Sequence, residues 1–158
     1  MKHIFLFILL GVISTVSAED QGIIGKVIEQ GKPVIYSFDN YLPETTTIED
    51  FPTLVVIKWG YDGSKNNGMP TKAEQELIYK LEDVLNDIAD DKGSFRAYAR
   101  TGNNLREFVY YTIDQPAFLQ LFNQAVANHP RYPIEITFYQ DPNWSDYKEL
   151  IADFKKDS

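Results

Sequence analysis

The sequence holds few of the side chains that carry nucleophilic or metal chemistry. Beyond residue 18 it contains one histidine, His129, and it has no cysteine. Cysteine–histidine catalysis and cysteine-based zinc sites are therefore excluded. A Ser-His-Asp triad would have to use His129, which precedes Pro130 at the end of a predicted helix, where a cationic side chain is favourable. We therefore interpret His129 as a structural residue, and no phosphate-loop, Gly-x-Ser-x-Gly or His-Glu-x-x-His pattern occurs.

Acidic side chains could bind a metal ion in two places. Asp141, Asn143 and Asp146 offer the oxygen ligands that Ca²⁺ prefers, but Asp141-Pro142 is also a typical helix start. The second place is an acid-rich helix end with Glu82, Asp83, Asp87, Asp90 and Asp91. We interpret the first as a helix cap and the second as a solvated face, and we predict no metal site and no cofactor.

The best candidate for function is a group of cationic and aromatic residues around one predicted hairpin. Tyrosine and arginine often anchor interfaces, and we predict that the group lies on an open sheet face and at the hairpin tip. The predicted binding residues are Lys58, Arg96, Tyr98, Arg100, Arg106, Glu107 and Tyr111. The alternative is that another strand, helix or subunit of the protein covers them.

Arg106 does not fit this face, because alternation places it on the apolar side of its strand. An unpaired buried guanidinium is too costly to persist. It must reach solvent past the turn, pair with a carboxylate such as Glu82 or Asp141, or bind a ligand. We favour the carboxylate partner, which would make Arg106 a structural clamp.

The hairpin that positions these residues spans 94–113. A two-residue loop needs positive φ angles, which Gly and Asn tolerate best, so the loop is Gly102-Asn103 or Asn103-Asn104. In the second case Arg100 lies opposite Glu107. A three-residue loop would exchange the faces of one strand. Alternation predicts one face that lies under a helix and carries Phe95, Ala97, Ala99, Phe108 and Tyr110.

Elements on both sides of the hairpin complete the predicted fold. Periodicity predicts helices at 71–91 and 115–128 and strands at 54–61 and 132–140. Thr71, in a capping box with Glu74, and Asp114 are the predicted caps of the two helices. The order from 54 to 140 is thus β-α-β-β-α-β, a two-layer ferredoxin-like core of an α+β fold. An N-terminal β-hairpin over 22–39 precedes the core. A C-terminal helix after Asp141 closes the chain, with one apolar face formed by Trp144, Tyr147, Ile151 and Phe154.

The first 18 residues have the features of a secretory signal peptide. Lys2 precedes an apolar run from Ile4 to Ile13, and Val16-Ser17-Ala18 is a small-residue cleavage site. Cleavage after Ala18 predicts a single domain at 19–158 that is periplasmic or secreted and spans no membrane; an uncleaved anchor is the alternative. The domain has 14 Lys and Arg against 23 Asp and Glu, a charge of 14 − 23 = −9, which argues against a nucleic-acid partner.

A series of short motifs follows the chain in a fixed order: Gly68-Met69-Pro70, Leu81-Glu82-Asp83, Arg100-Thr101-Gly102, Arg106-Glu107 with Tyr110, and Asp141-Pro142-Asn143-Trp144 with Tyr147. Together they resemble the bacterial family called domain of unknown function 695 (DUF695). The resemblance covers about residues 31–154. It implies no established activity, so no catalytic residue is transferred from it.

The residues therefore favour an exported, acidic, non-enzymatic module that binds a protein or small-molecule partner. The alternative is a hydrolase that uses carboxylates alone, with or without a metal ion. Two buried carboxylates facing each other in a cleft would favour the hydrolase. A flat aromatic face without such a pair would favour binding.

Overall fold

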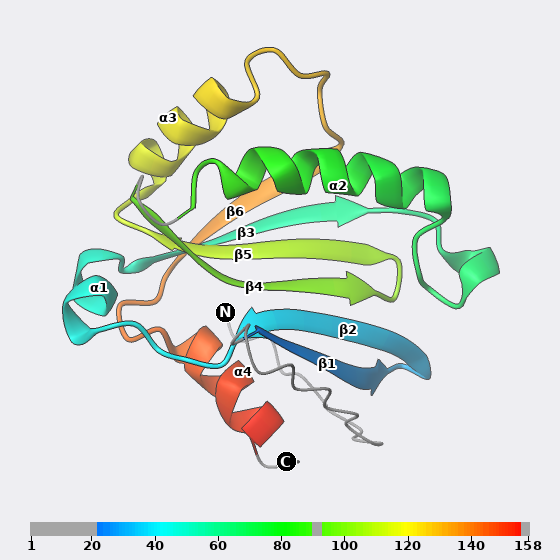
Figure 1. Ribbon diagram of the computed structural model, residues 1–158, viewed down its shortest axis with the longest axis horizontal. Coiled ribbons are helices and arrows are strands. Elements are labelled where there is room, and N and C mark those ends of the chain that lie inside the picture. Colours follow the sequence, from blue (N-terminus) through cyan, green and yellow to red (C-terminus); the bar gives the residue numbers. More distant parts are fainter. Residues whose placement is uncertain (1–21, 90–92, 156–158) are drawn as a thin grey trace.

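The computed structural model describes residues 22–89 and 93–155, which form one antiparallel sheet with helices on both faces (Figure 1). The predicted signal peptide at 1–18, Asp90 and Asp91 lie outside the described residues. Within them, no helix is long and apolar enough to cross a membrane. The elements in chain order are β1 (Gly22–Glu29), β2 (Lys32–Asp39), α1 (Thr45–Asp50), β3 (Thr53–Gly60), η1 (Ser64–Asn66), α2 (Lys72–Asn86), β4 (Ser94–Gly102), β5 (Leu105–Thr112), α3 (Gln115–Ala125), β6 (Ile134–Gln140) and α4 (Ser145–Lys155).

The six strands lie in the order β1-β2-β4-β5-β3-β6, and every neighbouring pair is antiparallel. The predicted α+β class is confirmed. The ferredoxin-like topology is not confirmed, because the strand order of the whole sheet differs. The N-terminal hairpin joins the sheet through β2, whose Tyr36 lies opposite Arg100 of β4. This long-range pairing has no local sequence signal.

Helices cover both faces of the sheet: α2 and α3 of the predicted core at 54–140 lie on one face, and the C-terminal helix α4 covers the other. One hydrophobic cluster lies between the sheet and helices α2 and α3, and it contains Ile57, Leu81 and Phe118. A second cluster lies on the opposite face, where Tyr147 and Ile151 of α4 contact the strands. Figure 1 shows α2 and α3 on one side of the strands and α4 on the other. We call these faces the α2 face and the α4 face.

Three helix starts follow the predicted capping chemistry. Thr71 accepts a hydrogen bond from the Glu74 amide at the start of α2, and Asp114 accepts one from the Ala117 amide at the start of α3. Asp141 accepts hydrogen bonds from the amides of the first two residues of α4. Its predicted role as a helix cap is therefore confirmed, although the helix itself begins at Ser145.

The hairpin closes through Asn103-Asn104, both in the left-handed conformation with φ of 48° and 65°. Arg100 consequently lies opposite Glu107, as this loop predicts. A β-bulge interrupts the pairing between Arg96 and Tyr98, so that Ala97 is an extra residue in β4. The predicted faces are therefore wrong for part of β4. Phe95 packs in the α4-face cluster, whereas Arg96 reaches Glu82 of α2.

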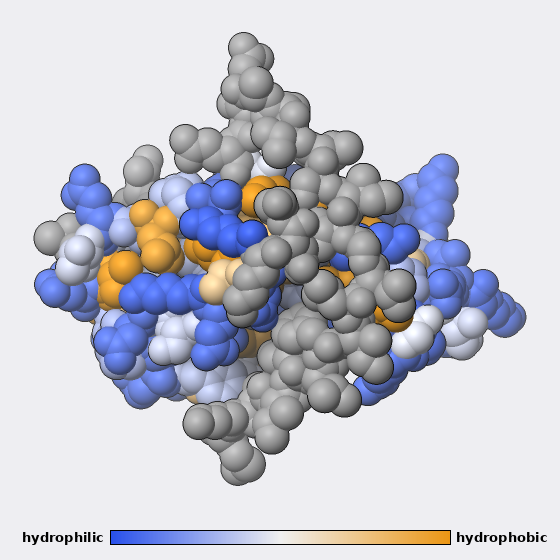
Figure 2. Space-filling model, turned by 90° about the horizontal axis from the view of Figure 1, so that it is seen from below, coloured by the Kyte–Doolittle hydropathy of each residue, from blue (hydrophilic) through white to orange (hydrophobic). Residues whose placement is uncertain are grey.

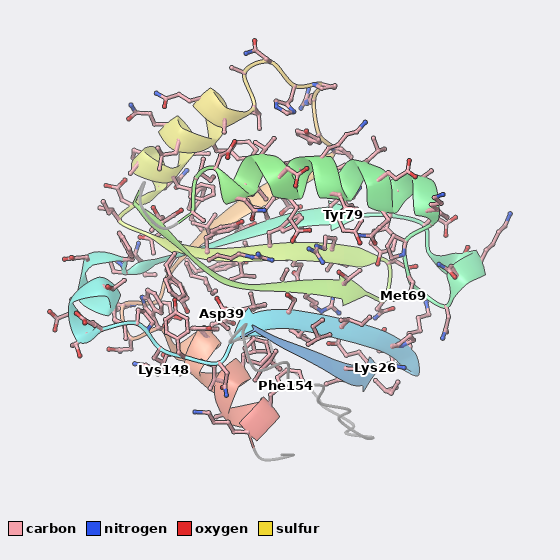
Figure 3. The ribbon with its side chains drawn as sticks, viewed as in Figure 1. Lys26, Asp39, Met69, Tyr79, Lys148 and Phe154 are labelled. Carbon is pink, nitrogen blue, oxygen red and sulfur yellow. The ribbon has the colours of Figure 1, made fainter. Side chains whose placement is uncertain are left out.

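Helix α4 docks on the sheet through aromatic residues. The ring of Trp144 stacks on Tyr111 with centroids 4.1 Å apart, and its Nε1 donates to the Phe51 carbonyl at 2.8 Å. Near the other end of the helix the Phe154 ring lies against the backbone of Gly25, where an added Cβ would overlap it (Figure 3). All four apolar residues predicted for this helix face are buried, which confirms that prediction.

Candidate functional site

The seven predicted binding residues do not share one face. Six lie on the hairpin β4–β5 and Lys58 lies on β3. The bulge and strand alternation divide them. Arg96 and Arg106 lie on the α2 face, where both contact Glu82. The α4 face holds the others, which are Lys58, Tyr98, Arg100, Glu107 and Tyr111.

On the α4 face, Arg100 lies between two carboxylates. Its Nη2 donates to Glu29, and its Nε lies 3.8 Å from Glu107 Oε2. The Tyr36 hydroxyl donates to the other Glu29 oxygen at 3.0 Å. Lys58 of β3 lies directly opposite Glu107 of β5. We call these five residues the Arg100 cluster.

The Arg100 cluster is nearly closed to solvent, and its charges compensate one another. The side chains of Arg100, Glu29 and Glu107 are 7%, 14% and 15% exposed. Burial disfavours the Arg100 cation, yet the hydrogen bond and charge of Glu29 with the charge of Glu107 raise its pKa. Burial raises the pKa of Glu107, because desolvation outweighs the attraction of Arg100 and Lys58. These contacts connect β1, β2, β4 and β5 and stabilise this part of the sheet.

Two predicted tyrosines hold α4 in place. The Tyr98 hydroxyl donates to Asp146 Oδ2 at 2.8 Å, and the Tyr111 hydroxyl donates to Asp141 Oδ2 at 2.7 Å. Burial raises the pKa of both hydroxyls, and the neighbouring carboxylates raise it further. Helix α4 therefore covers these two tyrosines, which agrees with the alternative prediction that another helix of the same protein covers them. From the side seen in Figure 2 the described surface alternates hydrophilic residues with small hydrophobic patches.

On the α2 face, two arginines share one carboxylate oxygen. Glu82 Oε1 accepts from Arg96 Nη2 at 3.0 Å and from Arg106 Nη2 at 2.9 Å. Arg106 also donates to Thr101 Oγ1, and its guanidinium carbon lies 4.6 Å from the centre of the Phe108 ring. We call Glu82, Arg96, Thr101 and Arg106 the Glu82 cluster. The predicted pairing of Arg106 with Glu82 is confirmed; Asp141 lies on the opposite face.

The Glu82 cluster carries an uncompensated positive charge. Two guanidiniums face one carboxylate, and the Arg96 side chain is 34% exposed. Burial lowers the pKa of Arg106; the charge of Arg96 lowers it further, while Glu82 opposes the shift. Arg106 Nε is buried and has no hydrogen-bond partner among the described residues. The cluster therefore offers charged donors toward solvent in a chain whose formal charge is −8.

The turn beside both clusters is fixed by the glycine-rich loop before α2. The Asn104 amide donates to the Gly68 carbonyl at 2.9 Å, and Asn104 Oδ1 accepts from the Gly63 amide at 3.0 Å. The Tyr61 hydroxyl donates to the same Gly68 carbonyl at 3.1 Å. A Cβ on Gly68 would lie only 3.0 Å from the Asn103 backbone. This packing holds Arg106, two residues after the turn, in a fixed position.

Sequence reasoning missed several participants. Glu29 and Tyr36 come from the N-terminal hairpin, and no local sequence pattern predicts that β2 pairs with β4. Tyr79 lies on α2 three residues before Glu82, and its side chain is 54% exposed. The i, i+3 spacing of Tyr79 and Glu82 on one helix side is a signal that could have found it.

The other residues considered for catalysis or metal binding do not come together in a site within the described residues. His129 Nδ1 lies 2.9 Å from the Tyr132 hydroxyl at an exposed position, with a tyrosine and not a serine as its partner. Across 22–89 and 93–155, no group of three His, Cys, Asp or Glu side chains could hold a metal ion. Asp141 is used as a helix cap.

Comparison with protein families gives one match. The family model described as "Family of unknown function (DUF695)" matches residues 26–151, most of the chain. This range includes both arginine clusters and the capping residue of α4. Comparison with curated proteins and with solved structures gave no match.

Proposed function

The chain belongs to the DUF695 family, a family of unknown function, and from its geometry we propose that it is a non-enzymatic binding module. The proposed site is the Glu82 cluster, and the group that it binds is an anion. One observation carries the proposal: Arg96 and Arg106 share a single carboxylate oxygen, and a third of the Arg96 side chain is exposed.

The donors of the cluster support this function. A guanidinium has five N–H donors, and the structure gives Arg96 one hydrogen bond within the described residues. Arg106 cannot turn away, because Glu82, Thr101 and the Phe108 ring fix its position. A fixed guanidinium beside an exposed one suits a charge-assisted hydrogen bond to an anion, at little cost in side-chain entropy.

The test is a titration with small anions followed by amide chemical shifts at low ionic strength. Sodium acetate and inorganic phosphate are the probes. We expect saturable shifts at Tyr79, Glu82 and Arg96, and affinity that is about ten-fold weaker in Arg96→Met. Arg131→Met, which removes an exposed arginine outside the cluster, is the matched control. Equal weakening in both variants, or no saturable shift, would overturn the proposal.

The second candidate function is a hydrolase that uses carboxylates. Glu29 and Glu107 favour it, since both are largely buried and the pKa of Glu107 is raised. Against it, Arg100 lies between the two carboxylates and pairs with Glu29. If the chain hydrolyses a panel of ester, glycoside and phosphate substrates, and Glu107→Gln abolishes the activity, the hydrolase replaces the binding module.

The binding module is proposed to be exported as one domain. Residues 1–18 would be removed after Ala18, and residues 19–158 would act in the periplasm or outside the cell. Mass spectrometry of the exported form should then give Glu19 as the first residue, and a full-length membrane-bound form would contradict this. We also infer that β3, α2, β4, β5, α3 and β6 are a ferredoxin-like unit to which the β1–β2 hairpin is an addition; their sheet order, β4-β5-β3-β6, supports this.

A further inference from the structure

Next to the Glu82 cluster, the α2 face continues onto strands that carry exposed apolar side chains. Ile24 of β1 is 61% exposed, and Ile28 and Ile35 are half-buried. None of these three isoleucines belongs to either hydrophobic cluster of the described chain. We call Ile24, Ile28 and Ile35 the isoleucine strip.

The strand register joins the strip to the arginines. Ile35 lies opposite Thr101, and Thr101 accepts a hydrogen bond from Arg106. Ile24 lies opposite Ser37, whose partner Ala99 is on the same row as Phe108. Adjacent strands are about 4.8 Å apart, so Ile35 and Arg106 are two strand spacings apart, about 10 Å.

Helix α2 borders this surface with an aromatic side chain. On the helix, Tyr79 and Glu82 lie on one flank, while Leu77 lies on the opposite one, about 200° away from Tyr79. The Tyr79 hydroxyl is close enough to Arg106 to influence its ionisation. Figure 3 shows Tyr79 on α2 and Lys26 on β1, with β5, β4 and β2 between these two elements in this view.

We propose that this surface, formed by the Glu82 cluster, Tyr79 and the isoleucine strip, binds an acidic peptide segment of a partner protein. The segment places a carboxylate on Arg96 and Arg106 and an apolar side chain on the strip. In an extended peptide, residues i and i+2 point to the same side about 7 Å apart, and a glutamate side chain reaches the remaining distance. The proposal rests on the anion-binding function proposed above.

Charge complementarity identifies the occupant. On the strands of this sheet face the charged residues are Lys26, Arg96 and Arg106 against Asp39. Glu82 of α2 contacts both arginines, and the resulting balance suits a single negative charge. The formal charge of −8 for the chain repels polyanions such as nucleic acids or an anionic membrane surface. Glu82 already accepts hydrogen bonds from both guanidiniums, and the carboxylate of the peptide would accept hydrogen bonds from N–H groups of the same two arginines. A monoanionic peptide with one adjacent apolar residue fits both halves of the surface.

Three short peptides test the proposal by amide chemical-shift titration: acetyl-Glu-Ser-Val-amide, acetyl-Gln-Ser-Val-amide and acetyl-Glu-Ser-Ser-amide. We expect the first to bind with shifts at both the Glu82 cluster and the isoleucine strip. Replacing its Glu by Gln should weaken binding about ten-fold, and replacing its Val by Ser about three-fold. Arg96→Met and Ile24→Ser should reproduce these two losses on the protein side.

Matched variants separate binding from folding. Arg131→Met and Leu77→Ser remove an exposed arginine and a 46% exposed apolar residue away from the surface, and they should leave the peptide affinity unchanged. Equal affinities of the Glu and Gln peptides, or shifts that map elsewhere, would overturn the proposal. If acetate binds through Arg96 but the Val and Ser peptides bind equally, the peptide proposal fails while anion binding stands. If neither acetate nor any peptide binds, both proposals fail.

Discussion

The two faces of the β4–β5 hairpin carry the same residue types in opposite proportions. In the Arg100 cluster one guanidinium has two carboxylates, its side chain is 7% exposed, and its pKa is raised. In the Glu82 cluster two guanidiniums have one carboxylate, Arg96 is 34% exposed, and the pKa of Arg106 is lowered. The first cluster joins strands together, whereas the second leaves positive charge at the surface. The ratio of opposite charges and the cover above them therefore separate a structural ion pair from a candidate binding site.

The sharpest test of this contrast is the removal of Arg100. Arg100→Met leaves Glu29 buried without its cation and Glu107 with Lys58 alone, so we expect the free energy of unfolding to fall by about 3–5 kcal/mol. Adding Glu29→Gln should recover part of this loss, because one uncompensated charge is then removed. Urea unfolding measures both effects, with Arg131→Met as the control. A loss as small as that of the control would show that the cluster is not a structural joint.

Removal of Arg106 should cost less. In Arg106→Met the carboxylate of Glu82 keeps Arg96 as a partner. The losses are one buried ion pair, the hydrogen bond to Thr101 and the contact with Phe108. We expect the free energy of unfolding to fall by about 1–3 kcal/mol. Arg106→Lys should restore only part of this stability, because a point charge cannot contact Glu82 and Thr101 together. A loss equal to that of Arg100→Met would remove the distinction between the two clusters.

The smallest expected effect is a pH dependence that belongs to the Arg100 cluster alone. Burial raises the pKa of Glu107 above its ordinary value of 4.5, so between these two values the folded chain binds more protons than the unfolded chain. The contribution of Glu107 to stability therefore increases as the pH falls through this interval and is lost as the pH rises through the raised pKa. Urea midpoints of the wild type minus those of Glu107→Gln should increase on acidification. A difference that decreases would mean that Arg100 and Lys58 outweigh burial.

Much of the fold follows from local sequence signals. The caps at Thr71, Asp114 and Asp141 and the buried face of α4 depend on residues a few positions apart, and each was predicted. The Asn103-Asn104 turn is one of the two loops that the sequence allowed. The pairing of β2 with β4 could not be predicted, because it depends on contacts between residues sixty or more positions apart. This pairing brings Glu29 and Tyr36 to Arg100.

The candidate site was only half predictable, for a reason that lies in one strand. The pairing of Arg106 with Glu82 was predicted from the cost of a buried unpaired charge. The faces were wrong for Phe95, Arg96 and Ala97, because strict alternation fails at the bulge. Ala97 and Ala99 are both small and apolar, so neither marks where the extra residue lies. The contacts of Tyr98 and Tyr111 with the start of α4 are likewise tertiary contacts, which no local sequence pattern predicts.

The bulge at Ala97 also changes what spacing between arginines means when related sequences are aligned. Arg96 and Arg100 are four positions apart, which in a regular strand would place them on the same face, yet here they serve opposite faces. A relative that lacks the extra residue would need its two arginines three positions apart to keep both contacts. A single-residue gap between these positions in an alignment would therefore preserve both clusters, whereas an ungapped alignment with a regular strand would merge them on one side.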